Sequence, residues 1–184
     1  MPFYQKRGQI PEKRHIQFRD INDNLYWEEL VSRQGFSHMY SNVYHINPPT
    51  AITKIGTPIK NKIQLNSKLH KHYHLKTATI SSQGDAISSR TPLFLNEDII
   101  VSKCHIDTSM KDLFKNTYAD EILFIHSGEG MLKSNFGFLN LSSGDYIVIP
   151  RGVIWQLEIT NPMKVLTIES NSPIETPERY RNKF

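Results

Sequence analysis

Seven short β-type runs follow one another between residues 93 and 170, and they restrict the possible fold more than any other feature. Each run is rich in aliphatic, β-branched or aromatic residues and is bounded by turn-forming Asn, Gly, Asp, Ser or Pro. The runs are LFLNEDIIVSKCHI, EILFIHSG, GMLKSN, FGFLNL, DYIVIP, VIWQLEI and MKVLTIES. Short strands at such close spacing are typical of an antiparallel sandwich or barrel. We therefore expect a mainly β chain.

The turn residues between the runs agree with this interpretation. The stretch from Ser134 to Gly137 predicts a hairpin turn, because Asn and Gly tolerate positive φ. Pro150 stands at the end of a run, where its missing N–H costs no ladder hydrogen bond, and Gly152 suits the turn that follows. The segment from Asp107 to Phe114 is compatible with a single capped helical turn.

The chain divides into three predicted parts. Residues 1–90 are rich in aromatics, prolines and polar turns, which predicts an extension of strands and loops packed on the barrel. Within it, Leu25 to Val31 is compatible with a strand or with one or two helical turns. Residues 91–172 form the predicted barrel. Residues 173–184 carry two prolines and several charges after the last run, as expected for the start of a linker to a further half.

Charge and cysteine content exclude several classes of protein. Residues 1–90 carry 13 Lys and Arg against 6 Asp and Glu, and residues 91–184 carry 9 against 12. The basic residues are dispersed, so we expect a solvated surface or an acidic partner rather than nucleic acid. The single cysteine, Cys104, excludes an internal disulfide. No apolar run resembles a signal peptide or a transmembrane span, so we expect a soluble cytoplasmic protein without membrane contact.

Two blocks of the regular half have the spacing of the cupin motifs. Glu121 is followed by six residues and Gly128, and Gly144 by five residues and Pro150-Arg151-Gly152. These spacings resemble those of the first cupin motif from its glutamate onward and of the second cupin motif from its first glycine onward. The resemblance implies a cupin-like antiparallel β-barrel or jelly roll, with the glycines and the proline shaping its turns.

The metal ligands of those motifs are missing. The positions of the histidine pair in the first motif fall on Lys115 to Thr117, and the histidine position of the second motif falls on Trp155. Only Glu121 remains of the ligand set. One carboxylate cannot hold the iron of a site that needs two histidines and a carboxylate. We therefore expect no metal or cofactor in this barrel, and we expect Trp155 to face inward as a filling aromatic.

A histidine row, His70, His72 and His74, offers an alternative metal site. On a strand these residues point to one face at a spacing of roughly 6.5 Å, so neighbouring imidazoles can converge on an ion. The row has no glutamate at cupin spacing and lies outside the regular half, and such rows also occur at interfaces and on surfaces. Whether it binds metal stays open. His126, in a β-type run, is expected to be an ordinary barrel or surface histidine.

Other catalytic arrangements are weakly supported. Cys104 lies in an apolar run without a cysteine-enzyme signature, so we expect a core thiol. Asp120 and Glu121 are adjacent, and adjacent residues on a strand point to opposite faces, which argues against an acid–base pair. The catalytic residues are unknown at this point.

A family resemblance covers nearly the whole chain. It rests on MPFYQKRGQIPEKRHIQF, LYWEELVSRQGFS, YHINPPT, the block from Asp120 to Glu158 and the ending SPIETPERYRN. In this order they resemble the N-terminal portion of a bacterial homogentisate 1,2-dioxygenase.

The resemblance implies a function for the whole protein. Members of that family are roughly twice as long, have two cupin-like halves, and use non-haem Fe(II) and O2 to open the ring of homogentisate in tyrosine and phenylalanine breakdown. Their iron ligands and catalytic histidine belong to the C-terminal half, and their oligomers are built from trimers. The resemblance thus implies a metal-free N-terminal half, inactive alone. Two alternatives stay open: a non-enzymatic cupin module that binds a small ligand or acts as a scaffold, and a metal protein using the histidine row.

Overall fold

Antiparallel strands make up most of the regular structure. The computed structural model describes residues 17–37, 40–58, 71–81 and 83–180. Its elements are β1 (Trp27–Ser32), β2 (Tyr40–His45), η1 (Thr77–Thr79), β3 (Thr91–Leu95), β4 (Ile99–Ile106), β5 (Phe114–Lys115), β6 (Asp120–Ser134), β7 (Gly137–Leu141), β8 (Tyr146–Ile149), β9 (Ile154–Ser170) and η2 (Glu178–Tyr180). The two η elements are single turns of 3-10 helix. The expected mainly β, antiparallel fold is confirmed. None of the described helices is long and apolar enough to cross a membrane.

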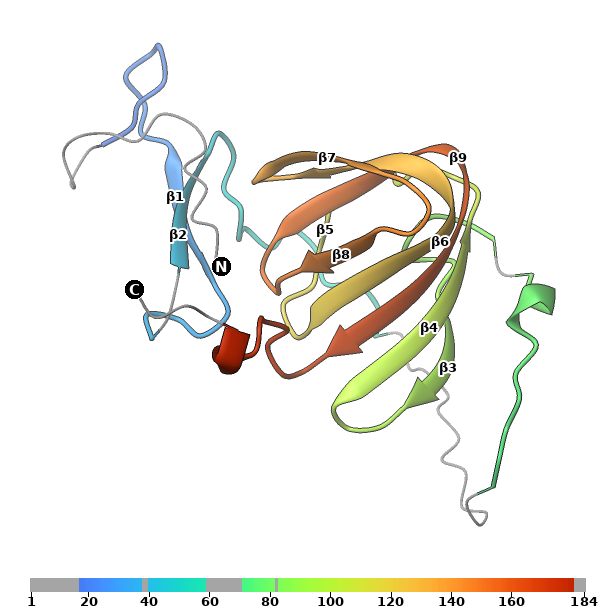
Figure 1. The fold of residues 1–184 in the computed structure, drawn as a ribbon. Helices are drawn as coiled ribbons and strands as arrows, with labels where there is room; N and C mark the ends of the chain where they lie inside the picture. Colours follow the sequence, from blue (N-terminus) through green and yellow to red (C-terminus); the bar gives the residue numbers. More distant parts are fainter. Residues whose placement is uncertain (1–16, 38–39, 59–70, 82, 181–184) are drawn as a thin grey trace.

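The seven strands β3 to β9 form one curled sheet, which we call the jelly roll. The strand order is β3-β4-β9-β6-β7, with β5 added beside β9 and β8 beside β6. Figure 1 shows the two longest strands, β6 and β9, running through the middle of this sheet, while the β1–β2 hairpin lies to one side. No ladder joins β3 to β7 within the described residues, so the sheet is a jelly roll rather than a closed barrel.

The two longest strands differ from the sequence prediction. The runs EILFIHSG and GMLKSN belong to the single strand β6, and VIWQLEI and MKVLTIES belong to the single strand β9. The register of β6 against β9 shifts three times between Ile125 and Gly130. Gly128 has a φ of 96°, and a Cβ there would lie 2.4 Å from the Pro162 carbonyl oxygen. The turn-forming residues therefore mark a bend in continuous strands and not a break between strands.

Most shorter turns follow the prediction. The turn before Gly137 connects β6 to β7, and Pro150 follows the last residue of β8. Gly152 has a φ of 84°, the left-handed region that favours glycine. The ambiguous segment around Leu25 resolves as strand β1.

The predicted helical turn after Asp107 does not form. The backbone N–H of Met110 donates to the Leu157 carbonyl at 2.9 Å, and the Ser109 hydroxyl accepts from the Ile159 N–H at 3.0 Å. The segment therefore uses its hydrogen-bonding groups across to β9 instead of within itself.

The core lies on the inner face of the jelly roll. Alternate residues of β4, β6 and β9 point inward, as the two-residue period of a strand requires. The largest fully buried side chains include Trp155, Ile106, Leu123, Ile125, Leu157, Met163, Glu121, Val165 and Thr167. Val31 of β1 joins this core, so the β1–β2 hairpin contacts the interior of the jelly roll through this residue.

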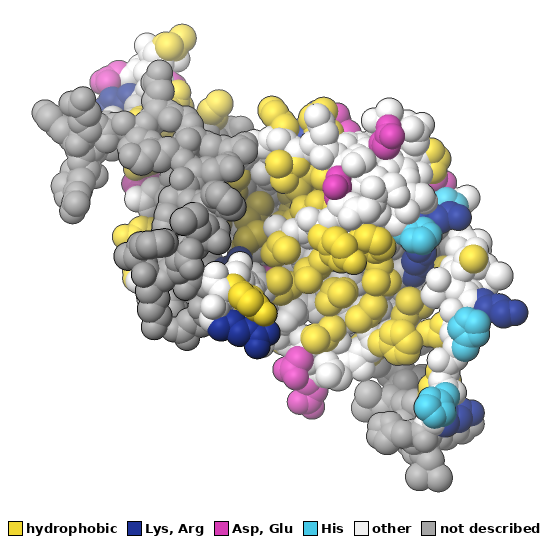
Figure 2. Space-filling model, viewed as in Figure 1, with side chains coloured by type: hydrophobic (Ala, Val, Ile, Leu, Met, Phe, Trp, Pro, Cys, Tyr) yellow, Lys and Arg dark blue, Asp and Glu magenta, His cyan; other side chains and the backbone are white. Residues whose placement is uncertain are grey.

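Hydrophobic side chains also gather on the outer surface. Figure 2 shows them spread over the face of the jelly roll turned to the viewer. On β8, Tyr146 is 72% exposed and Val148 45% exposed. The Tyr146 ring lies 4.5 Å from that of Phe124 on the neighbouring strand β6. The outer face therefore presents apolar side chains to solvent.

Candidate functional site

The segment Lys115 to Thr117, where the first cupin motif has its histidine pair, contacts other parts of the chain. Lys115 on β5 pairs its ammonium with Glu29 of β1, and Glu29 also contacts His45 Nε2 at 2.9 Å. Asn116 donates from Nδ2 to Glu169 Oε1 at 3.2 Å. Its Oδ1 accepts the backbone N–H of Ala119 at 2.9 Å. Lys115 and Asn116 therefore hold the β1–β2 hairpin and the loop before β6 in place.

The second-motif position is filled by a buried aromatic. Trp155 is fully buried, and its ring meets that of Phe114 edge-on at 5.7 Å and 82°. The two residues are partners in the β5–β9 ladder, which places both rings in the same part of the interior. Trp155 is thus an inward-facing aromatic, as predicted.

Glu121, the remaining residue of the ligand set, is paired with an arginine. Its side chain is fully buried on the inner face of β6. Glu121 Oε1 lies 2.7 Å from Arg90 Nη1, an ion pair that lacks the alignment of a hydrogen bond. Neither oxygen of Glu121 has a hydrogen-bond partner within the described residues. The carboxylate is therefore held by charge more than by directed donors.

Arg90 also contacts a second inward carboxylate. Its Nη1 lies 3.1 Å from Glu169 Oε1, and Glu169 is the ladder partner of Glu121. The guanidinium is held from behind by Nε donating to the Ala86 carbonyl at 3.1 Å, and it lies 5.8 Å from the centre of the Phe114 ring. Burial and the charge of Glu121 raise the pKa of Glu169, and the charge of Arg90 opposes them. One cation thus serves two carboxylates.

The residues at the motif positions do not fit an iron ion. A non-haem Fe(II) site of this type takes two imidazoles and a carboxylate. Here the imidazole positions hold an ammonium side chain paired with Glu29 and a buried indole, and the carboxylate already faces a guanidinium. We therefore derive no step of chemistry through iron in this jelly roll.

Asp120 and Glu121 point to opposite faces of β6, as predicted, so they form no acid–base pair. Asp120 Oδ1 accepts from the backbone N–H and from Nε of Arg151, at 3.0 and 3.1 Å. Its Oδ2 accepts the Ile174 N–H at 2.9 Å and lies 3.4 Å from Arg33 Nε. Burial raises the pKa of Asp120, but the donors and charges around it outweigh burial and lower it. Asp120 fastens distant segments together.

Cys104 is a core thiol, as predicted. It is buried on the inner face of β4, with Sγ 3.1 Å from the Thr167 hydroxyl. Burial raises the pKa of the Cys104 thiol, against the smaller effects of Thr167 and Arg90. A buried thiol with a raised pKa is a poor nucleophile.

The histidine row stays an untested prediction. His70 lies outside the described residues, and His72 and His74 are exposed in backbone that belongs to no strand. Across the described part of the chain, no three His, Cys, Asp or Glu side chains are placed to hold a metal ion. His126 is exposed on β6, 6.4 Å from the Phe124 ring.

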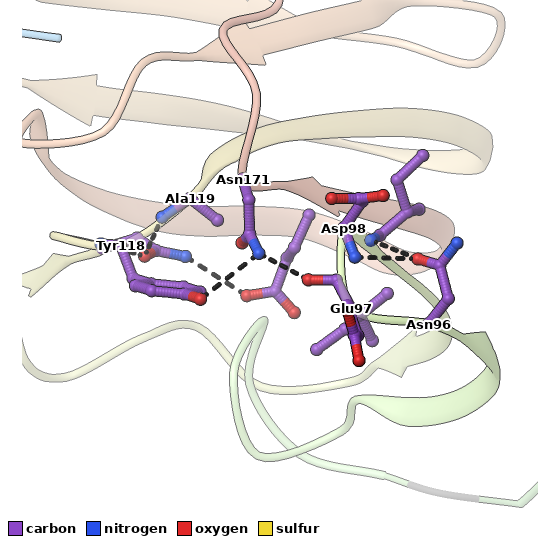
Figure 3. A pocket seen from close by; sticks show the side chains of 10 residues that line it. Asn96, Glu97, Asp98, Tyr118, Ala119 and Asn171 are labelled. Carbon is purple, nitrogen blue, oxygen red and sulfur yellow. Dashed lines mark hydrogen bonds between the residues drawn. The ribbon is translucent and has the colours of Figure 1, made fainter. Parts of the chain in front are cut away.

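A cavity of about 200 Å³ opens at the end of the jelly roll near the β3–β4 turn. Figure 3 shows its lining residues hydrogen-bonded to one another, both between side chains and between side chains and backbone groups. Asn171 Nδ2 donates to the Glu97 carbonyl at 2.6 Å and to the Tyr118 hydroxyl at 3.2 Å. Glu169 lines this cavity and also contacts Arg90, so the cavity borders the buried ion pair.

Two residues of this site were not found from the sequence. Glu169 carried only an ambiguous signal, because it follows Met163, Val165 and Thr167 at a period of two while the apolar Leu166 and Ile168 occupy the opposite face. Arg90 carried none. It lies in an irregular segment before β3, where no period predicts the direction of a side chain.

Comparison with known proteins gives a family and relatives. The family described as "Homogentisate 1,2-dioxygenase N-terminal" matches residues 78–179. A protein of Saccharolobus solfataricus, named as a dioxygenase, is 37% identical over 186 residues, which cover 100% of this chain and 48% of that protein. The chain therefore spans about half the length of this relative.

Solved structures with some likeness to the fold include cupin proteins. One is a cupin-2 domain containing protein from Shewanella frigidimarina, with a TM-score of 0.41 and 18% identity over 45% of this chain and 79% of that chain. KdgF from a Halomonas species has a TM-score of 0.41 and 17% identity over 46% of this chain and 78% of that chain.

Proposed function

Because this chain belongs to the homogentisate 1,2-dioxygenase N-terminal family, we propose that it is the metal-free cupin half of a ring-cleaving dioxygenase. The complete enzyme in this proposal uses non-haem Fe(II) and O2 to open homogentisate in tyrosine and phenylalanine breakdown. The iron ligands belong to a second cupin half. This chain alone turns over nothing.

One observation carries the proposal: the motif positions hold no imidazole, and their one carboxylate faces an arginine. Lys115 is engaged by Glu29, Trp155 fills the interior, and Glu121 faces Arg90. A metal-binding cupin places imidazoles and an unpaired carboxylate at these positions. The chain keeps the shape of the motif and uses its ligand positions for packing and charge pairing.

The remaining parts of the proposal concern the assembly. Residues 91–172 are the proposed cupin unit, residues 1–90 its packing extension, and residues 173–184 the start of a linker. The exposed apolar side chains on β8 suit a surface that is covered in the complete enzyme. We further propose a trimer-based assembly in the cytoplasm, by resemblance to the family.

Oxygen uptake tests the proposal directly. The chain alone, with Fe(II) and homogentisate, should consume no O2. The other half of the Saccharolobus relative, outside the matched region, is produced as a separate protein. It should bind this chain in size-exclusion chromatography. The mixture of the two should consume O2 when homogentisate is added. The relative's own matched part is the positive control. Uptake by this chain alone would contradict the proposal, and so would failure to bind or activate where the control succeeds.

The cavity beside Glu169 favours a second candidate, a cupin module that binds a small ligand without catalysis. Its polar groups already bond to one another, which leaves few donors for a ligand. This candidate predicts that the chain acts without any further half. Reconstituted oxygen uptake would therefore decide against it.

A further inference from the structure

A single guanidinium lies between two inward carboxylates on neighbouring strands. Glu121 on β6 and Glu169 on β9 are direct partners in the ladder. Side chains at such a pair stand close together, and like charges directly opposite one another are destabilising. Arg90 Nη1 contacts both, at 2.7 Å from Glu121 Oε1 and 3.1 Å from Glu169 Oε1. The arrangement is a cation bound by two carboxylates.

Burial makes this cation necessary. The Glu121 side chain is fully buried, Arg90 is 12% exposed and Glu169 is 20% exposed. An ionised carboxylate taken out of water needs a paired charge. Within the described chain, Arg90 is the only cationic side chain that forms an ion pair with either carboxylate.

The rest of the site holds the guanidinium in position. The Ala86 carbonyl accepts its Nε–H, and the Phe114 ring lies beside it. Phe114 in turn packs against Trp155, the residue at the second-motif ligand position. The arginine thus connects the carboxylate of the first motif to the aromatic pair that fills the second.

We propose that the Arg90 guanidinium is the resident cation of the jelly roll, that it closes Glu121 and Glu169 to metal ions, and that its removal opens a site for a divalent cation. The two carboxylates offer only oxygen ligands, which favours a hard cation such as Mn²⁺, Mg²⁺ or Ca²⁺. This inference concerns residues of this chain only and holds whether or not the chain serves a dioxygenase.

The test uses Mn²⁺ as the probe, with binding followed by the electron paramagnetic resonance of free Mn²⁺ and by thermal unfolding. Arg90→Met removes the charge while keeping a long apolar side chain. Arg90→Lys keeps the charge and is the matched control. Arg90→Met combined with Glu121→Gln removes the charge and one carboxylate together, so it separates this site from any other Mn²⁺ site in the chain.

Wild type and Arg90→Lys should show no rise in Tm with millimolar MnCl2. Arg90→Met should have a lower Tm than wild type, bind one more Mn²⁺ than the double variant, and recover Tm on adding MnCl2. The double variant should be more stable than Arg90→Met in the absence of metal and should not respond to MnCl2.

Two results would overturn the proposal: Mn²⁺ binding by wild type that is lost in Glu121→Gln, or a folded Arg90→Met that binds no more Mn²⁺ than the double variant. If Arg90→Met does not fold, refolding in MnCl2 should rescue it, and adding both Glu121→Gln and Glu169→Gln should restore folding without metal. Failure of both rescues would count against the proposal.

Discussion

Asp120 and Glu121 are neighbours on strand β6 and both are fully buried. They point to opposite faces of the jelly roll, and their carboxylates have different kinds of partner. On the outer face, Asp120 accepts three hydrogen bonds and meets a second arginine. On the inner face, Glu121 contacts Arg90 alone and accepts no hydrogen bond from the described residues. The Asp120 carboxylate holds several segments together through hydrogen bonds and ion pairs, whereas the Glu121 carboxylate forms one ion pair, with Arg90.

The partners of the two carboxylates come from different parts of the chain. Asp120 joins Arg33 after β1, Arg151 in the turn after β8, and Ile174 after β9. It therefore ties both flanking segments to the jelly roll. Glu121 joins a residue just before β3 and stays within the jelly roll. The difference indicates that loss of Asp120 should affect the whole described chain, and loss of Glu121 only the interior.

The largest expected effect comes from breaking the contacts of Asp120. Asp120→Ala should lower the free energy of unfolding by about 3 kcal/mol, because breaking a buried ion pair leaves its partner uncompensated. Urea unfolding monitored by tryptophan fluorescence measures the change. Asp120→Asn, which keeps the shape, should lose less. A loss below about 1 kcal/mol for Asp120→Ala, the value of an ordinary exposed ion pair, would contradict this role of Asp120.

A smaller effect is expected on the inner face. Glu121→Gln should cost about 1 to 2 kcal/mol, because no hydrogen bond is lost and Glu169 continues to neutralise Arg90. Urea unfolding alongside Asp120→Asn compares like with like, since both changes replace a carboxylate with its amide. If Glu121→Gln proves the more destabilising of the two, the contrast between the faces is wrong.

The two faces should also respond to pH in opposite directions. The folded-state pKa of Asp120 lies below its ordinary 3.8, so the unfolded chain binds more protons there and stability falls as pH drops below that value. The folded-state pKa of Glu169 lies above its ordinary 4.5, so stability falls as pH rises from that value through the raised pKa. The urea midpoint is measured from pH 3 to 7. In Asp120→Asn its decrease towards low pH should become smaller, and in Glu169→Gln its decrease as pH rises above 4.5 should become smaller. Unchanged slopes in these variants would assign the pH dependence to other groups.

The smallest effect concerns the hairpin contact at the first ligand position. Lys115→Ala should cost about 0.5 to 1 kcal/mol, because its partner Glu29 keeps His45 and the lysine is partly exposed. Lys111→Ala, a change at an exposed lysine nearby, should be close to neutral. Thermal unfolding of both variants measures the difference. Equal Tm values for the two variants would show that the ion pair between Lys115 and Glu29 does not stabilise the hairpin.

The sequence predicted the features that depend on local patterns. The β-type runs, the turn before Gly137, the burial of Trp155 and Cys104, and the opposite directions of Asp120 and Glu121 all follow from a period of two and from turn chemistry. These features need no knowledge of distant segments.

The features that depend on tertiary context were missed. The sequence predicts a strand break at Gly128 where the structure has a bend, because spacing does not distinguish a glycine that permits a close approach to Pro162 from a turn glycine. The Asp107 segment was interpreted as a helical turn because its bonds to β9 are invisible in its own sequence. Arg90 and the partners of Asp120 come from irregular segments, whose side chains follow no period.

The proposed resident cation beside Glu121, the carboxylate at the cupin-motif position, is the Arg90 guanidinium and not a metal ion. Metal analysis after anaerobic loading with Fe(II) and gel filtration tests it most directly, with wild type compared against Glu121→Gln. Equal iron contents are expected for the two proteins, because Arg90 occupies the place of the cation in both. One equivalent of iron in wild type that disappears in Glu121→Gln would contradict it.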